Sequence, residues 1–124
     1  YAILSEQFKR PFEIVRLPFN TSTLAQVGAI SALADQAFIQ KTVSTNASER
    51  EKWEAFLTQA EVDYYLSQAN FVFFDTKKDS KKLAEELMQA GYIVRAGLRD
   101  QWLRVTIGYP EDNQKLRDVL TTIW

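Results

Sequence analysis

The feature that most constrains the fold is a short alternating segment near the end of the chain, followed at once by a helix signal. In Trp102–Ile107, Leu103 and every second residue after it are apolar, which is the period of a strand with two different faces. Pro110 then stands where a first helical residue is favoured, and an acidic pair after it suits the positive end of a helix dipole. Such a strand must cover its apolar face, so we expect a small sheet with packed helices.

The segments before this strand continue the exchange of strand and helix signals. Phe71–Phe74 is a short aromatic run typical of a strand. Asp79 or Ser80 can cap the helix that follows, and Gly91 stands where a helix commonly ends in a left-handed residue. Tyr92–Arg95 predicts a further strand before a glycine-containing turn. The order strand, helix, strand, strand, helix predicts an α+β fold with helices on one face of a small sheet.

A strand and helices are predicted before this unit. Tyr1–Leu4 is typical of a strand, and Ser5–Gln7 could open a short helix that Pro11 limits. Lys41–Ala60 has one apolar stripe and predicts a long amphipathic helix, with Glu49–Lys52 on its solvent-exposed side.

One helical segment is apolar on nearly every side. It runs from Leu24 to Phe38, and Thr21, Ser22 or Thr23 can cap its start. A helix that is apolar all round is buried on several faces, which a domain of 124 residues can hardly provide. We therefore expect a neighbouring segment or a dimer partner to cover it.

Absent residue types exclude several kinds of chemistry. The chain contains no His and no Cys, so it lacks the usual general base near neutral pH, thiolate nucleophiles and the commonest metal ligands, and no metal site is expected. The 15 basic residues balance 16 acidic ones, which gives no field that would attract nucleic acid. No apolar run is long enough for a membrane span, so neither nucleic acid nor membrane is an expected partner.

Two arginines are candidate ligands for an anion. Arg104 lies on the face of its predicted strand opposite Leu103 and Val105, and Arg95 closes the strand before it. A planar guanidinium group matches the two oxygens of a carboxylate or phosphate. Spacing alone also allows two solvated surface arginines, because exposed ion pairs are common and weak.

The chain resembles the histidinol-phosphate aminotransferases over essentially its whole length. The segment that begins at Ser67 resembles their "S-x-A-N-F", the one at Gly91 their "G-[IV]-[IL]-V-R", and the one at Leu103 their "L-R-[IV]-T-[IV]-G-T-P-E-E-N". Val15–Asn20 and Leu24–Gln26 are similar to their "V-R-x-P-[FY]-N" and "L-A-Q". Each motif is weak alone, whereas the ordered set is specific. Tyr109 departs from the pattern, because the family usually has Thr or another small residue before this proline.

The resemblance implies a fold-type I pyridoxal-phosphate enzyme that transfers an amino group between L-histidinol phosphate and 2-oxoglutarate in histidine biosynthesis. It implies that Arg104 binds the substrate α-carboxylate and that Arg95 contributes to binding the phosphate. The lysine that carries the cofactor in this family, and the arginine that binds the cofactor phosphate, match no position here. The resemblance therefore implies the C-terminal part of the enzyme, without catalytic or cofactor-binding residues, without bound pyridoxal phosphate and inactive by itself.

It also implies a domain organisation and partners. Residues 1–40 would form the end of the large cofactor-binding domain with an interface helix, 41–61 a connecting helix, and 62–124 the small C-terminal domain. The expected partners are a small amino-acid or amino-alcohol phosphate substrate and a second copy in a homodimer. The expected location is the cytoplasm.

Other functions remain open at this point. An aromatic aminotransferase or a phosphothreonine-type decarboxylase of the same fold would keep similar motifs in the small domain. A protein of a different class, a non-catalytic α+β anion-binding module, would use Arg95 and Arg104 without catalysis.

Overall fold

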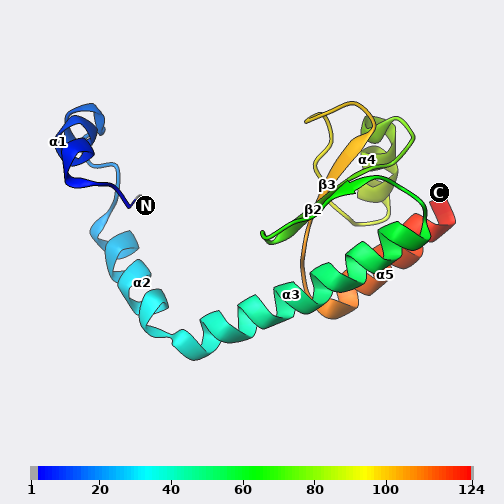
Figure 1. Cartoon of the computed structure of the whole chain (residues 1–124), viewed down its shortest axis with the longest axis horizontal. Coiled ribbons are helices and arrows are strands. Elements are labelled where there is room, and N and C mark those ends of the chain that lie inside the picture. The colour runs from blue at the N-terminus through cyan, green and yellow to red at the C-terminus, as the bar shows by residue number, and fades with distance from the viewer. Residues whose placement is uncertain (1–2, 124) are drawn as a thin grey trace. The chain divides into compact units, whose positions relative to one another are not determined.

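The computed structural model describes residues 3–123 and divides the chain into two compact units, Tyr1–Ile39 and Gln40–Trp124 (Figure 1). The first unit holds two helices, α1 (Glu6–Val15) and α2 (Thr23–Ala34). Helix α3 (Gln36–Gln59) begins at the end of this unit and belongs mainly to the second.

The start of the chain differs from the prediction. Tyr1 and Ala2 of the predicted strand lie outside the described residues, and Ile3 and Leu4 have no regular structure. Pro11 lies inside α1, so the expectation that it limits the helix is wrong. Proline removes only one helix N–H and its φ is compatible with a helix, so the surrounding turns can continue at some cost.

The predicted apolar helix is interrupted. Ser22 caps α2 by accepting a hydrogen bond from the Ala25 amide at 3.2 Å, which selects one of the three expected caps. A single helix from Leu24 to Phe38 is wrong, because Asp35 leaves helical geometry. Its carboxylate accepts a hydrogen bond from the Phe38 amide at 3.0 Å and so caps α3. Asp side chains commonly form such local bonds to the backbone, and these compete with a continuous helix.

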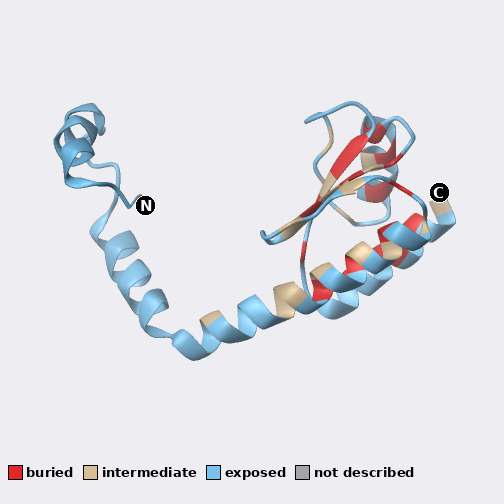
Figure 2. Cartoon of the chain, in the orientation of Figure 1, coloured by how far each residue is buried: buried red, intermediate tan, exposed pale blue. Residues whose placement is uncertain are grey.

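Helix α3 is longer than predicted, starting at Gln36 rather than Lys41. Its apolar stripe is confirmed in the second half, where Trp53 and Leu57 are fully buried, whereas Val43 in the first half is exposed. Figure 2 shows the same change along the helix, with buried residues confined to its second half.

The prediction that Glu49 lies on the solvent-exposed side of α3 is wrong, because its side chain is 1% exposed. Helix α5 (Pro110–Ile123) runs beside the second half of α3 and covers it (Figure 1). The carboxylate accepts hydrogen bonds from Lys52 Nζ at 2.6 Å and Asn113 Nδ2 at 3.1 Å, and Arg117 Nη1 lies 3.4 Å away. Burial opposes ionisation of Glu49, but these hydrogen bonds and the two positive charges prevail and hold its pKa below the ordinary 4.5.

The sheet has three antiparallel strands in the order β1 (Tyr64–Tyr65), β2 (Phe71–Asp75) and β3 (Trp102–Thr106). The strands at 71–75 and 102–106 confirm the prediction, and β1 was not predicted. The predicted strand Tyr92–Arg95 is wrong, because only Arg95 pairs, in an isolated bridge to Arg104. Gly91 and Gly97, with φ of 92° and 80°, turn the chain before and after this segment, and only one of its residues pairs with β3.

One face of the sheet is covered by helices and builds the core of the second unit. Helix α4 (Ser80–Gln89) is capped by Asp79, whose carboxylate accepts hydrogen bonds from the amides of Lys81 and Lys82, and it packs against β3. Strands and helices contribute these buried side chains: Trp53, Leu57, Val72, Phe74, Leu83, Leu87, Leu103, Val105, Leu116 and Leu120. The expected α+β fold, a small sheet with helices, is confirmed.

Candidate functional site

The second face of the sheet carries the candidate site. Val72 and Phe74 of β2 point into the core, so Phe73 points to the opposite face. Arg104 of β3 lies directly across from Phe73 in the register. Residues opposite each other in an antiparallel pair share a face, so Arg104 lies on the face that the core does not use.

The structure brings the two predicted arginines together. The Arg95 amide donates to the Arg104 carbonyl oxygen at 3.0 Å, and the Arg104 amide donates to that of Arg95 at 2.9 Å. Such a doubly bonded pair directs both side chains to the same face. Arg95 is exposed and Arg104 is half-buried, so an anion can approach both from solvent.

This pair carries uncompensated positive charge. Within residues 3–123, the salt bridges connect other groups, and no acidic side chain pairs with Arg95 or Arg104. Like charges directly opposite each other in a sheet are destabilising. A bound carboxylate or phosphate would remove this cost and add charge-assisted hydrogen bonds.

Arg104 has a buried donor that finds no partner among the described residues. Its guanidinium carbon lies 5.1 Å from the centre of the Phe71 ring, a cation–π distance. Its Nε is buried and has no hydrogen-bond partner in the described part of the chain. An unsatisfied buried donor costs about 1–3 kcal/mol. The side chain is therefore held by packing and retains hydrogen-bonding capacity.

An aromatic cluster borders the arginines on the same face. The Trp102 ring lies 4.9 Å from that of Phe73 and 5.0 Å from that of Tyr65, between ring centres. Arg99 stacks over Trp102 at 4.6 Å and donates to the Tyr65 hydroxyl at 3.0 Å. These contacts join Tyr65, Phe73, Arg99 and Trp102 into one packed cluster beside the arginines.

Arg99 is a third arginine beside this face that the sequence reasoning missed. The Trp102 amide donates to the Arg99 carbonyl oxygen at 3.1 Å, so the two residues close one turn. Gly97 and the turn directly before the strand were visible in the sequence. They would have indicated that Arg99 returns toward Trp102.

A cavity of about 490 Å³ adjoins Phe71, the ring on which Arg104 stacks. It is lined by the segment between β1 and β2 and by strand residues: Tyr65, Leu66, Ser67, Gln68, Ala69, Phe71 and Phe73. A mostly apolar wall next to a cation suits a small molecule with an anionic group and an apolar or aromatic part.

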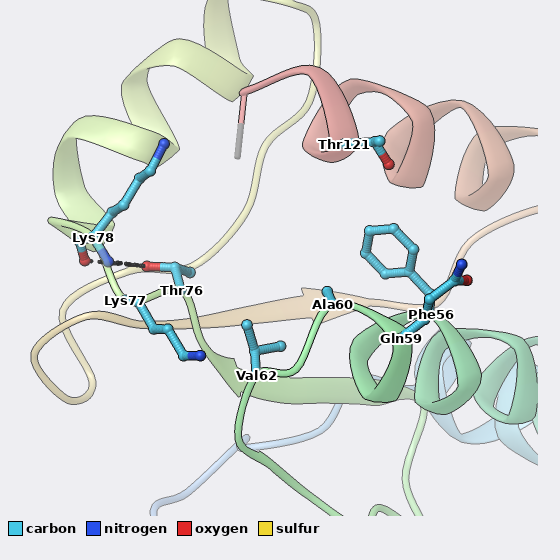
Figure 3. Close-up of a pocket in the computed structure, with 8 residues that line it drawn as sticks. All are labelled: Phe56, Gln59, Ala60, Val62, Thr76, Lys77, Lys78 and Thr121. Carbon is cyan, nitrogen blue, oxygen red and sulfur yellow. Dashed lines mark hydrogen bonds between the residues drawn. The ribbon is translucent and has the colours of Figure 1, made fainter.

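A second cavity, of about 540 Å³, lies away from both arginines and is lined by Lys77 and Lys78 among others (Figure 3). Lys77 Nζ donates to the Glu61 carbonyl oxygen at 2.6 Å, and Lys78 Nζ donates to that of Ile123 at 2.7 Å. Both ammonium groups are thus bonded to main-chain oxygens, and the Ile123 oxygen lies at the C-terminal end of α5, where the helix dipole is negative and disfavours anions. The open sheet face is therefore the better anion site.

Other kinds of site find no support in the part of the chain that is described. Residues 3–123 contain no group of three or more acidic side chains, His or Cys able to hold a metal ion. No described helix is both long and apolar enough to cross a bilayer.

Known proteins are similar to this chain over nearly its whole length. The family model "Aminotransferase class I and II" matches residues 1–120. A histidinol-phosphate aminotransferase of Lactiplantibacillus plantarum is 42% identical over 120 residues, which cover 97% of this chain and 33% of that protein. One of Limosilactobacillus fermentum is 44% identical over 112 residues, covering 90% of this chain and 31% of that protein.

The fold is shared with solved structures. The crystal structure of histidinol-phosphate aminotransferase from Sinorhizobium meliloti, in complex with pyridoxal-5'-phosphate, matches with a TM-score of 0.74 at 21% identity, covering 93% of this chain and 34% of that one. The chain spans about a third of the length of the curated relatives it matches.

Proposed function

The chain belongs to the aminotransferase class I and II family, and we propose that it forms the C-terminal part of a pyridoxal-phosphate-dependent aminotransferase acting on L-histidinol phosphate and 2-oxoglutarate. The matching relatives carry the name histidinol-phosphate aminotransferase and are about three times as long as this chain. The proposed place of the whole protein is histidine biosynthesis in the cytoplasm.

The observation that carries the proposal is the pair Arg95 and Arg104, two cations on one open face that have no acidic partner among residues 3–123. In the proposed enzyme, Arg104 binds the α-carboxylate of the amino-acid or oxo-acid substrate. Arg95 contributes to binding the phosphate of L-histidinol phosphate. Both substrates are thereby oriented, which lowers the entropic part of the barrier.

The residues of this chain do not fit the cofactor itself. Pyridoxal phosphate supplies an electron sink when it is bound to an enzyme through a lysine. Every lysine of the chain is exposed, and three of them, Lys52, Lys77 and Lys78, donate to protein oxygens. A lysine that carries a cofactor must instead lie in a protected pocket. We therefore propose that segments outside these 124 residues hold the cofactor and that this chain anchors the substrate without turnover by itself.

The proposed organisation follows the same reasoning. Residues 1–40 complete the large domain, 41–61 connect, and 62–124 form the small domain that carries both arginines. The apolar side chains of α2 are exposed, among them Leu24, Ile30 and Leu33. We propose that they are covered in a homodimer, because soluble proteins rarely leave such an apolar surface free.

The deciding experiment measures amino transfer by the full enzyme that contains this chain. A rate with L-histidinol phosphate and 2-oxoglutarate well above that with phenylalanine supports the proposal. A good rate with phenylalanine and none with L-histidinol phosphate would replace it with an aromatic aminotransferase. Loss of carbon dioxide instead of amino transfer would indicate the decarboxylase, and anion binding without any turnover would indicate the non-catalytic module.

A further inference from the structure

A single buried amide side chain ties the chain after β3 to α5. The Gly108 amide donates to Asn113 Oδ1 at 3.1 Å, and Asn113 Nδ2 donates to the Gly108 carbonyl oxygen at 3.0 Å. Both main-chain polar groups of Gly108 are thus held by one side chain. Asn113 is buried, so water does not compete for these bonds.

Glu49 of α3 determines which way this amide points. Asn113 Nδ2 also donates to Glu49 Oε2 at 3.1 Å. An ionised carboxylate only accepts hydrogen bonds, so the NH₂ end of Asn113 must face it and the oxygen end is left for the Gly108 amide. Lys52 and Arg117 hold the carboxylate of Glu49 in turn. Helices α3 and α5 and the end of β3 therefore meet at one point.

Gly108 is the position where this support is needed. The Ile107 amide donates to the Asn70 carbonyl oxygen at 2.8 Å, which continues the pairing with β2 just past the end of β3. Glycine has more backbone freedom than any other residue, so without the Asn113 bonds the chain after Ile107 would move more easily.

Arg104 depends on the position of this strand. Its side chain has no hydrogen bond or ion pair within the described residues, and its Nε is an unpartnered buried donor. The guanidinium group is located by the β3 backbone beneath it and by the Phe71 ring. A shift of β3 would therefore move the group that meets the substrate.

We propose that Asn113, oriented by Glu49, is a positioning residue that fixes the strand carrying Arg104 for binding of the substrate carboxylate. The inference rests on the proposed function, because it assigns Arg104 the role stated there. Asn113 and Glu49 act through the backbone of Gly108 and touch no substrate.

The first test compares Asn113→Ala with Leu120→Ala in the full enzyme. Leu120 is fully buried on the same helix, so its truncation lowers stability without touching Gly108. We expect Asn113→Ala to raise KM for 2-oxoglutarate on the order of tenfold to a hundredfold, because a displaced Arg104 loses hydrogen bonds to the carboxylate and one such bond changes binding by about this factor. The value of kcat per cofactor-loaded site should change much less, and Leu120→Ala should leave KM unchanged. An unchanged KM in Asn113→Ala, or an equal rise in Leu120→Ala, would overturn the inference.

A rescue experiment separates orientation from bulk. Asn113→Asp places two carboxylates together and should raise KM. Adding Glu49→Gln to it restores a hydrogen bond between the two positions with donor and acceptor exchanged, so KM should fall back part of the way. A double variant no better than Asn113→Asp alone would contradict the orienting role of Glu49.

Hydrogen exchange distinguishes failure of this inference from failure of the proposed function. In the 124-residue chain, Asn113→Ala should speed exchange at the amides of Ile107 and Gly108 while α4 keeps its wild-type rates. Wild-type exchange at Gly108 would overturn the positioning role even in an active enzyme. A wild-type enzyme that transfers no amino group would refute the proposed function. Faster exchange at Ile107 and Gly108 in Asn113→Ala would then still support the role of Asn113 in holding the chain after β3.

Discussion

Arg104 combines three properties in one side chain. It is half-buried, it stacks on Phe71, and its Nε has no partner within residues 3–123. Its cross-strand neighbour Arg95 has the same charge. A side chain kept in this state gains stabilisation when an anion arrives, so its contribution should appear in binding more than in folding.

Replacing Arg104 tests this contribution directly. Arg104→Gln removes the charge and the bidentate donor, and a hydrogen bond to a charged group contributes about 1.5–3 kcal/mol. We expect kcat/KM of the full enzyme for 2-oxoglutarate to fall by roughly ten- to a hundredfold or more, as measured by steady-state kinetics. Arg104→Lys should recover little, because an ammonium group lacks the planar fork. Lys115→Gln, which removes an exposed charge in α5, serves as the control and should keep wild-type kinetics.

Glu49 makes the stability of the chain depend on pH. Its pKa lies below 4.5 in the folded chain because the hydrogen bonds from Lys52 and Asn113 prevail over burial, whereas the unfolded chain regains the ordinary value. The stabilisation is fully present above 4.5 and is lost as the pH falls through the folded pKa, because the unfolded state binds more protons in that window. Urea unfolding at pH values on both sides of 4.5 measures the effect.

The matched variants for this measurement are Glu49→Gln and Glu51→Gln on the same helix. Glu49→Gln should flatten the dependence of the free energy of unfolding on pH below 4.5. Glu51 is exposed, and its replacement should leave the dependence as in the wild type. Equal slopes for the wild type and Glu49→Gln would show that the carboxylate is not stabilised in the folded chain.

At the scale of elements, segments with a local signal were predictable and those that depend on a neighbour were not. The alternation in 102–106, the Asp79 cap and Pro110 at the start of α5 each follow from a few adjacent residues. Glu49 was misplaced because its burial is decided by α5, a helix far along the chain. Arg95 and Arg104 were predicted as site residues, but their direct pairing depends on the register of the fold and could not be read from spacing.

Helix α3 offers an element-scale prediction, because its apolar stripe is buried only in its second half. Leu57→Ala leaves a cavity in the core and should lower the free energy of unfolding by roughly 2–5 kcal/mol. Val43→Ala, a similar truncation on the same helix at an exposed position, should change it by less than about 0.5 kcal/mol. Urea unfolding followed by tryptophan fluorescence measures both, and similar losses would mean that the first half of α3 is packed as well.

At the scale of the whole molecule, the two units differ in how they are stabilised. The second unit has a core of its own, whereas no described residue of the helices α1 and α2 is buried within the chain. Figure 2 shows this first unit as exposed throughout α1 and α2. Helices without a core of their own need other segments or another chain to bury their apolar side chains. This agrees with a chain that spans about a third of the length of its relatives.

We therefore expect the 124-residue chain to self-associate through residues 24–38. Sedimentation at increasing concentration should show species larger than a monomer, together with binding of a dye that reports apolar surface. Introducing charge with Ile30→Asp and Leu33→Asp should restore the monomer, because both side chains are exposed on α2. A clean monomer of the unmodified chain at high concentration would contradict the expectation.

The single bridge that carries Arg95 has a further consequence. Arg104 belongs to a five-residue strand, whereas Arg95 is joined to it by two hydrogen bonds at one position and is flanked by glycine turns. The backbone of Arg95 is thus held by fewer interstrand contacts than that of Arg104, so Arg95 is the more adjustable of the two arginines. The enzyme proposed above receives two unlike substrates in alternation, so its anion site must accept groups of unequal width. In that proposal the adjustment takes place at Arg95, and the pairing of β2 with β3 stays as it is.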